Sequence, residues 1–105
     1  MNETTRTRYQ ARARILKAMA HPSRLFIIDR LAEGERCVCE LTEMIGADKS
    51  TVSKHLSVLK EAGIVADDKR GLKVYYTLRM PCVTNLFSCI EAVLKSNAEA
   101  QLAAV

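Results

Sequence analysis

The segment STVSKHLSVLKEAGIV, from Ser50 to Val65, decides the fold. Its large apolar residues recur at intervals of three and four, which predicts one buried stripe on an α-helix. Either Asp48 or Ser50 can cap the start of this helix, and Gly63 ends the pattern. The predicted buried residues are Val52, Leu56 and Leu59.

A shorter helix is predicted just before this one, from about Val38 to Ile45, with Gly46 after it. Two helices joined by a short turn that contains glycine form the helix-turn-helix arrangement. Short hydroxyl side chains let the second helix lie deep in a major groove and donate to phosphates or base edges, while lysine supplies positive charge. His55 either hydrogen-bonds within the fold or reaches phosphate, and we favour the structural role. The candidate DNA contacts here are Lys49, Ser50, Thr51, Ser53 and Lys54.

A change from helical to strand-like sequence follows the second helix. Ile64 to Ala66 and Val74 to Leu78 are rich in β-forming residues, and the charged stretch from Asp67 to Gly71 between them is typical of a turn. The pattern predicts a β-hairpin, which after a helix-turn-helix forms a wing. Basic side chains on this hairpin can reach the flanking DNA backbone or the minor groove. They are Lys69, Arg70 and Lys73.

Further helices are predicted on both sides of this unit. Apolar spacing indicates one helix from Arg6 to Ala20 and another from Pro22 to about Glu33, and Pro81 opens the last. Residues 1–5 and about 97–105 are expected to be loose. The apolar face of the last helix is suited to packing on a second copy of the chain. The inward residues of the second helix are predicted to be Leu25, Ile28, Leu31 and Ala32.

The predicted fold is therefore mainly α with a β-hairpin wing, in the order α-α-α-α-β-β-α, as one domain across residues 1–105. The chain has 16 basic and 12 acidic residues, a net charge of +4 and a pI near 9.0, which favours an anionic partner such as double-stranded DNA. No apolar run approaches the ~18 residues of a membrane helix. We find no secretory signal, so we expect a cytoplasmic protein, and a chain this short leaves little room for an enzyme pocket.

Four cysteines stand out: Cys37, Cys39, Cys82 and Cys89. Without a secreted context they indicate metal-binding or redox-active thiols, with buried structural cysteines as the alternative. On a regular helix Cys37 and Cys39 would point about 200° apart. They can share one ion only if the first helical turn loosens or stays extended. Cys82 and Cys89 lie two turns apart on the last helix, so in an antiparallel helix pair Cys82 of one chain could approach Cys89 of the other, as a second site or a disulfide.

Three blocks of the sequence resemble the bacterial ArsR/SmtB winged-helix repressors. They are LKAMAHPSRLFIIDRLAEGE (Leu16 to Glu35), the segment from Ser50 to Val65, and GLKVYYTL (Gly71 to Leu78). The resemblance covers about residues 13–95. It implies a homodimer built on the first and last helices, a recognition helix that starts near Ser50, and release from operator DNA when an inducer binds.

The stretch CVCEL, from Cys37 to Leu41, resembles the signature of arsenite and antimonite sensors within that family, and a related version serves cadmium and lead. Soft thiolates select such thiophilic ions. Thr42 stands where some arsenic sensors carry a third cysteine, so a third thiolate comes from elsewhere or two suffice. Cys82 also falls near a position where other family members place a metal ligand. We expect the ion as an inducer and no prosthetic group.

Other functions remain open at this point. The same fold can respond to cadmium or lead, or to thiol oxidation and persulfide formation at the four cysteines. A thiol oxidoreductase or metal carrier would belong to a different class, but the chain lacks the Cys-x-x-Cys spacing and a βαβ pattern. His21 and His55 are the only histidines and neither lies on the last helix, which gives little sign of a zinc site of the His/Asp type.

Overall fold

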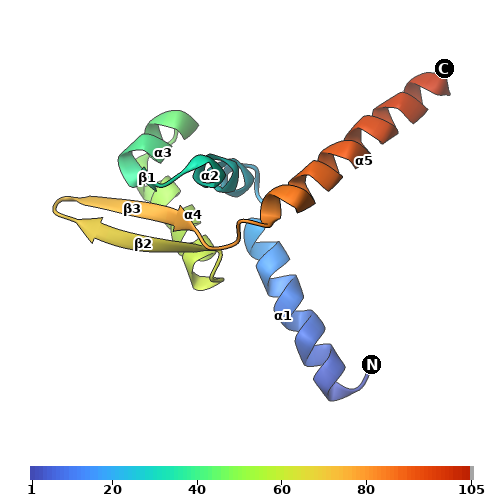
Figure 1. Cartoon of the computed structure of the whole chain (residues 1–105), viewed down its shortest axis with the longest axis horizontal. Coiled ribbons are helices and arrows are strands. Elements are labelled where there is room, and N and C mark those ends of the chain that lie inside the picture. The colour runs from blue at the N-terminus through green and yellow to red at the C-terminus, as the bar shows by residue number, and fades with distance from the viewer. Residues whose placement is uncertain (105) are drawn as a thin grey trace.

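A computed structural model describes residues 1–104 as a small body from which two long helices project in different directions (Figure 1). The body holds α2, α3, α4 and a three-stranded sheet, and the projecting helices are α1 and α5. The predicted fold class, mainly helical with a wing after a helix-turn-helix, is confirmed. The elements are α1 (Glu3–Met19), α2 (Pro22–Glu33), β1 (Arg36–Cys37), α3 (Val38–Ile45), α4 (Lys49–Glu61), β2 (Val65–Arg70), β3 (Lys73–Leu78) and α5 (Val83–Ala103).

The core lies where α2, α3 and α4 pack on one another and on the sheet. The stripe predicted for α4 is confirmed, because all three of its apolar residues are fully buried. The inward face predicted for α2 is partly wrong. Leu25 and Ala32 are exposed, whereas Ile27, which the spacing did not select, is fully buried. The inner face of α2 is made by Ile27, Ile28 and Leu31.

The start of α4 is capped by Asp48, one of the two predicted candidates. Its Oδ1 accepts a hydrogen bond from the Thr51 backbone N–H at 2.7 Å. The turn from α3 into α4 passes through Gly46, which has a φ of +76°. A residue with a Cβ atom adopts that left-handed conformation at a cost, so glycine suits this short connection.

The sheet contains one strand more than the sequence predicted. Its order is β1-β3-β2, and all pairs are antiparallel. β1 is so short that it has no periodicity of its own, and it exists because Arg36 and Cys37 pair with Tyr76 and Tyr75.

The turn predicted from Asp67 to Gly71 is also wrong, because β2 continues to Arg70, which pairs with Lys73. Only Gly71 and Leu72 form the turn, and two-residue loops of this kind favour glycine. The charged side chains of β2 are exposed on a ribbon, so their polarity is compatible with a strand.

Both chain ends differ from the expected loose segments. α1 begins at Glu3, because Asn2 Oδ1 accepts from the Thr5 N–H at 2.8 Å and so caps the helix. α5 begins at Val83, two residues after Pro81, and continues to Ala103 through an alanine-rich stretch of high helix propensity. Val105 lies outside the described residues. No helix within residues 1–104 has the length and apolar character needed to cross a membrane.

Candidate DNA interface and cysteine site

The predicted DNA contacts lie on two neighbouring surfaces of the body, the first turns of α4 and the wing. Of the eight residues only Ser53 is half-buried, and the other seven are exposed. The Ser50 hydroxyl donates to Asp48 Oδ1 at 3.0 Å, so this side chain also supports the helix cap. Hydrogen bonds from Thr51 and Ser50 lower the pKa of Asp48, which keeps a negative charge at the positive end of the helix.

Arg70 on the wing is engaged by carboxylates of its own chain. Its Nη1 and Nη2 donate to the two oxygens of Glu35 at 2.6 and 2.9 Å, and its Nε donates to Asp68 at 2.9 Å. The guanidinium also lies 4.6 Å from the centre of the Tyr75 ring. The hydrogen bonds from Arg70 lower the pKa of Glu35. In this conformation Arg70 ties the wing to the loop before β1, and it would have to exchange partners to bind phosphate.

His55 makes contacts within the fold, in agreement with the structural role that we favoured. Its Nδ1 accepts from Arg24 Nε at 3.2 Å, and its ring centre lies 4.3 Å from that of His21. His21 in turn caps α2, because its Nδ1 accepts from the Ser23 N–H at 3.0 Å. Burial, followed by the charges of His21 and Arg24, lowers the pKa of His55.

This contact predicts a pH-dependent stability. The folded protein resists protonation of His55, whereas the unfolded chain takes up a proton near the ordinary pKa of 6.5. The contribution of neutral His55 to the free energy of unfolding is therefore fully present above pH 6.5. It is lost as the pH falls below this value, because protons then bind the unfolded chain more readily than the folded protein. We expect the urea midpoint to be lower at about pH 5.5 than at about pH 7.5, and the difference to shrink in His55→Gln. An equal pH dependence in both proteins would contradict this assignment.

Cys37 and Cys39 lie side by side although they are separated by only one residue. Cys37 is the last residue of β1 and the N-cap of α3, with an extended backbone at φ −79° and ψ 160°. Cys39 belongs to the first turn of α3. The two Cα atoms are 5.4 Å apart, and a disulfide joins the sulfurs. Of the two ways predicted for the cysteines to meet, a loosened first turn or an extended one, Cys37 has the extended backbone.

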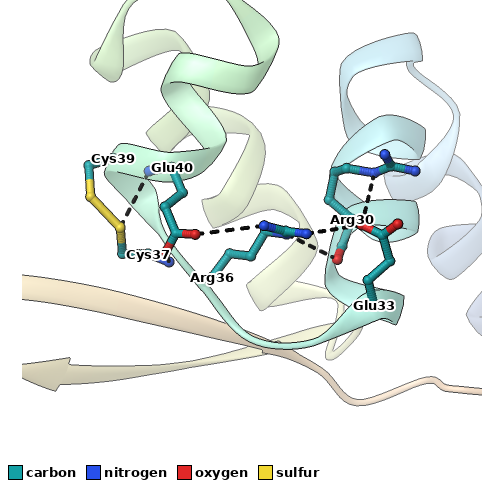
Figure 2. A network of polar contacts seen from close by, with 6 residues as sticks. All are labelled: Arg30, Glu33, Arg36, Cys37, Cys39 and Glu40. Carbon is teal, nitrogen blue, oxygen red and sulfur yellow. Dashed lines mark hydrogen bonds and ion pairs between the residues drawn. A yellow bond between two sulfur atoms is a disulfide. The ribbon is translucent and has the colours of Figure 1, made fainter.

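The start of α3 is held by hydrogen bonds that involve Cys37 (Figure 2). Cys37 Sγ accepts from the Glu40 N–H at 3.3 Å, and the Glu40 carboxylate accepts from the Cys37 N–H at 3.1 Å. Arg36 extends this capping box, because it lies 3.6 Å from Glu40 and donates to Glu33 of α2 at 3.0 Å. Cys37 is thus tied to α3 directly and to α2 through Arg36.

Cys37 also contacts the wing, since it pairs with Tyr75 of β3. A cleft of about 500 Å³ adjoins the cysteine pair where α3, α4 and β3 meet. Both cysteines line it, together with predicted DNA contacts from α4 and the wing. The predicted contacts in this lining are Lys49, Ser53 and Lys73.

Cys82 and Cys89 are not brought to this site. Both are exposed and free; Cys82 immediately precedes α5, and that helix points away from the body (Figure 1). Within residues 1–104 no three His, Cys, Asp or Glu side chains gather in a way that would hold a metal ion. The cysteine site of the single chain therefore has two sulfur donors.

Comparison with known proteins places this architecture among bacterial regulators. The family profile described as bacterial regulatory protein, arsR family, matches residues 21–67. An uncharacterized HTH-type transcriptional regulator of Mycobacterium tuberculosis is 34% identical over 87 residues, which span 82% of this chain and 76% of that protein.

Two solved structures resemble the whole fold. The homodimeric winged helix-turn-helix DNA-binding domain of a possible ArsR-family regulator from Mycobacterium bovis has a TM-score of 0.79 and 31% identity, covering 95% of this chain and 93% of that one. The transcriptional repressor BigR from Xylella fastidiosa has a TM-score of 0.73 and 33% identity, covering 89% and 96%.

Proposed function

Because the chain belongs to the ArsR family of bacterial regulatory proteins, we propose that it represses transcription at an operator and leaves the DNA when trivalent arsenic or antimony binds Cys37 and Cys39. Its relatives are named as regulators of transcription, and we assign the chain to that class and not to the enzymes. The observation that carries the proposal is the position of the cysteine pair, between the helix-turn-helix and the wing.

The donor set fits a soft ion. Two thiolates are suited to trivalent arsenic or antimony and poorly suited to magnesium or calcium. The Glu40 carboxylate already accepts from the Cys37 N–H and pairs with Arg36, so it is occupied by its own chain. The start of a helix also stabilises negative charge such as that of a thiolate. The disulfide has to be reduced to two thiols before an ion can bind.

Ion capture has a direct route to the DNA-binding surfaces. The Cys37 sulfur that would bind the ion is the same atom that accepts from the Glu40 N–H. Loss of a helix cap costs about 1 kcal/mol, which would favour a different setting of α3. The pairing of Cys37 with Tyr75 couples the same residue to the wing. A ligand acts through its unequal affinity for two states, and we place the difference at this cap.

We further propose that two chains associate through α1 and α5. Both helices project from the body, and each exposes large apolar side chains that a single chain leaves in water. A contiguous apolar face on a soluble protein marks an interaction surface. A homodimer would present two α4 helices to two operator half-sites. The exposed apolar residues are Tyr9, Ile15 and Leu16 on α1 and Ile90, Val93, Leu94 and Leu102 on α5.

A second candidate function is a thiol–disulfide switch at the same pair. The disulfide between Cys37 and Cys39 supports it, because the two sulfurs are joined while Cys37 also caps α3. In this alternative an oxidant removes two electrons from the two thiols, and the resulting disulfide sets the DNA affinity. The two candidates predict different inducers for one site.

The inducer is tested by titration of the reduced protein on DNA from its own promoter. Arsenite, antimonite, cadmium, lead and zinc are added separately, and hydrogen peroxide and a polysulfide are added after the reductant is removed. We expect arsenite and antimonite to weaken binding by about 5- to 150-fold, and the ion-free complex to weaken steeply with salt.

Each alternative has its own outcome in this experiment. Release by peroxide or polysulfide alone would replace the ion-sensing proposal with the redox one. Release by cadmium or lead alone would change the proposed inducer. Failure to bind any promoter fragment at low salt would contradict the repressor function itself.

A further inference from the structure

The proposed inducer can take one sulfur donor more than the cysteine pair supplies. Trivalent arsenic forms three bonds in a pyramid, and Cys37 and Cys39 account for two of them. Cys82 immediately precedes α5 and Cys89 lies in the first half of that helix, and neither lines the cleft beside the cysteine pair. Within the described part of the chain no third ligating side chain joins the pair. A third sulfur donor would therefore come from a small molecule in solution.

The cleft beside the cysteine pair can hold a small organic molecule. Its volume of about 500 Å³ falls within the range of about 300 to 1,000 Å³ that is usual for ligand sites. Apolar side chains from α3 and the wing line part of it, so a short carbon chain would find contact there. These side chains are Val38, Leu72, Val74 and Tyr76.

The charged side chains of the cleft favour an anion. Lys49 and Lys73 line it, and neither takes part in the ion pairs formed among residues 1–104. Two carboxylates line it as well. Asp67 is neutralised by Lys60, whose Nζ donates to it at 2.9 Å, which leaves Glu43 as the one acidic side chain outside those pairs. Two cations against one carboxylate give the lining a positive balance.

We propose that the third ligand of the bound ion is a small anionic thiol from solution, held in this cleft by Lys49 and Lys73. This inference rests on the proposed function and specifies the ligand of the same site. Arsenous acid loses its three hydroxyl groups as three waters, whose protons come from the two cysteine thiols and the small thiol. Three As–S bonds replace three As–O bonds, and arsenic remains trivalent, so the step needs no oxidant or reductant.

A thiol bound in the cleft would also affect DNA binding, because it would contact residues that are predicted to bind DNA. Lys49, Ser53 and Lys73 line the cleft and are also predicted DNA contacts. A carboxylate that pairs with the two lysines competes with the phosphates that they would otherwise meet. The anionic thiol therefore adds direct competition to the change at the α3 cap.

Three thiols of similar size and different charge test the proposal. The Cys82→Ser/Cys89→Ser variant is reduced with a phosphine, which introduces no thiol, and is loaded with arsenite. Mercaptoacetate, 2-mercaptoethanol or cysteamine is then added, and native mass spectrometry measures the fraction of chains that retain both arsenic and thiol. We expect retention to be greatest for mercaptoacetate and smallest for cysteamine.

Two further variants test whether Lys49 and Lys73 cause the preference for the anionic thiol. Adding Lys49→Gln and Lys73→Gln should lower mercaptoacetate retention by roughly 2- to 10-fold, given that each exposed ion pair is worth up to about 1 kcal/mol. The matched control, Lys54→Gln with Lys69→Gln, removes the same charge from predicted DNA contacts outside the cleft and should retain the preference.

The possible failures are distinguishable. If the reduced protein does not retain arsenite with or without any thiol, the proposed function fails. If arsenite is retained but the thiol is not, or all three thiols are retained equally, this inference is overturned and the proposed function stands. The inference is also overturned if the unsubstituted protein forms three As–S bonds without an added thiol and the Cys82→Ser/Cys89→Ser variant forms only two. In that case Cys82 or Cys89 supplies the third sulfur.

Discussion

Replacing Cys37 or Cys39 with serine should leave the protein on its operator at arsenite concentrations that release the unsubstituted protein. Either change removes one of two adjacent sulfur donors, and a single thiolate no longer chelates the ion. Where arsenite weakens operator binding of the unsubstituted protein by about 5- to 150-fold, the affinity of each variant should change by less than about 2-fold. Fluorescence anisotropy of labelled operator DNA measures this effect.

Folding and DNA binding should survive these substitutions. Serine is among the best N-cap residues, so Ser in place of Cys37 can accept from the Glu40 N–H as the sulfur does. Cys39 is exposed and caps nothing. Cys82→Ser and Cys89→Ser are the controls and should respond to arsenite as the unsubstituted protein does. If Cys37→Ser and Cys39→Ser also retain full release, the cysteine pair is not the sensor.

The double substitution Val93→Glu/Leu94→Glu should convert the protein to a monomer. Operator binding should weaken by about 100-fold or more, because a monomer cannot contact the second half-site. The two side chains are 53% and 55% exposed in the single chain. The proposed helix pairing would bury both, and burying unpaired carboxylates is costly. Light scattering after size exclusion measures the mass, and anisotropy measures the operator affinity.

The matched control for this prediction is Ala92→Glu. Ala92 is exposed and lies on the side of α5 opposite the apolar face, where a carboxylate remains in water. It should leave both mass and affinity unchanged. A double glutamate variant that remains a dimer would exclude this face of α5 as the interface.

The parts of the fold that the sequence predicted correctly are those with strong local signals. The α4 stripe, its Asp48 cap and the glycine after α3 are determined by residues a few positions apart. β1 was missed because its two residues form a strand only through pairing with β3, more than thirty residues away. The hairpin turn was predicted too long because exposed charges on a strand and in a loop look alike. The face of α2 was predicted incompletely because this helix packs against several elements at once.

The position of the candidate site could be predicted from the sequence, but its conformation could not. The spacing of Cys37 and Cys39 marked the pair, whereas its conformation depends on Cys37 being a strand end and an N-cap. The sequence did contain a signal for the cap. Glu40 lies three residues after Cys37, which is the spacing of a capping box, although cysteine takes the position usually held by serine or threonine. The contact of Arg70 with Glu35 had no such signal, since it joins residues 35 positions apart.

The most direct test follows ion binding and DNA release in one titration. Phosphine-reduced protein on labelled operator DNA is titrated with arsenite while As–S absorbance and DNA anisotropy are recorded together. The account predicts that both signals change in parallel and reach their end points at one ion per chain. Saturation of the As–S absorbance while the anisotropy stays at its bound value would contradict the claim that ion capture by Cys37 and Cys39 releases the DNA.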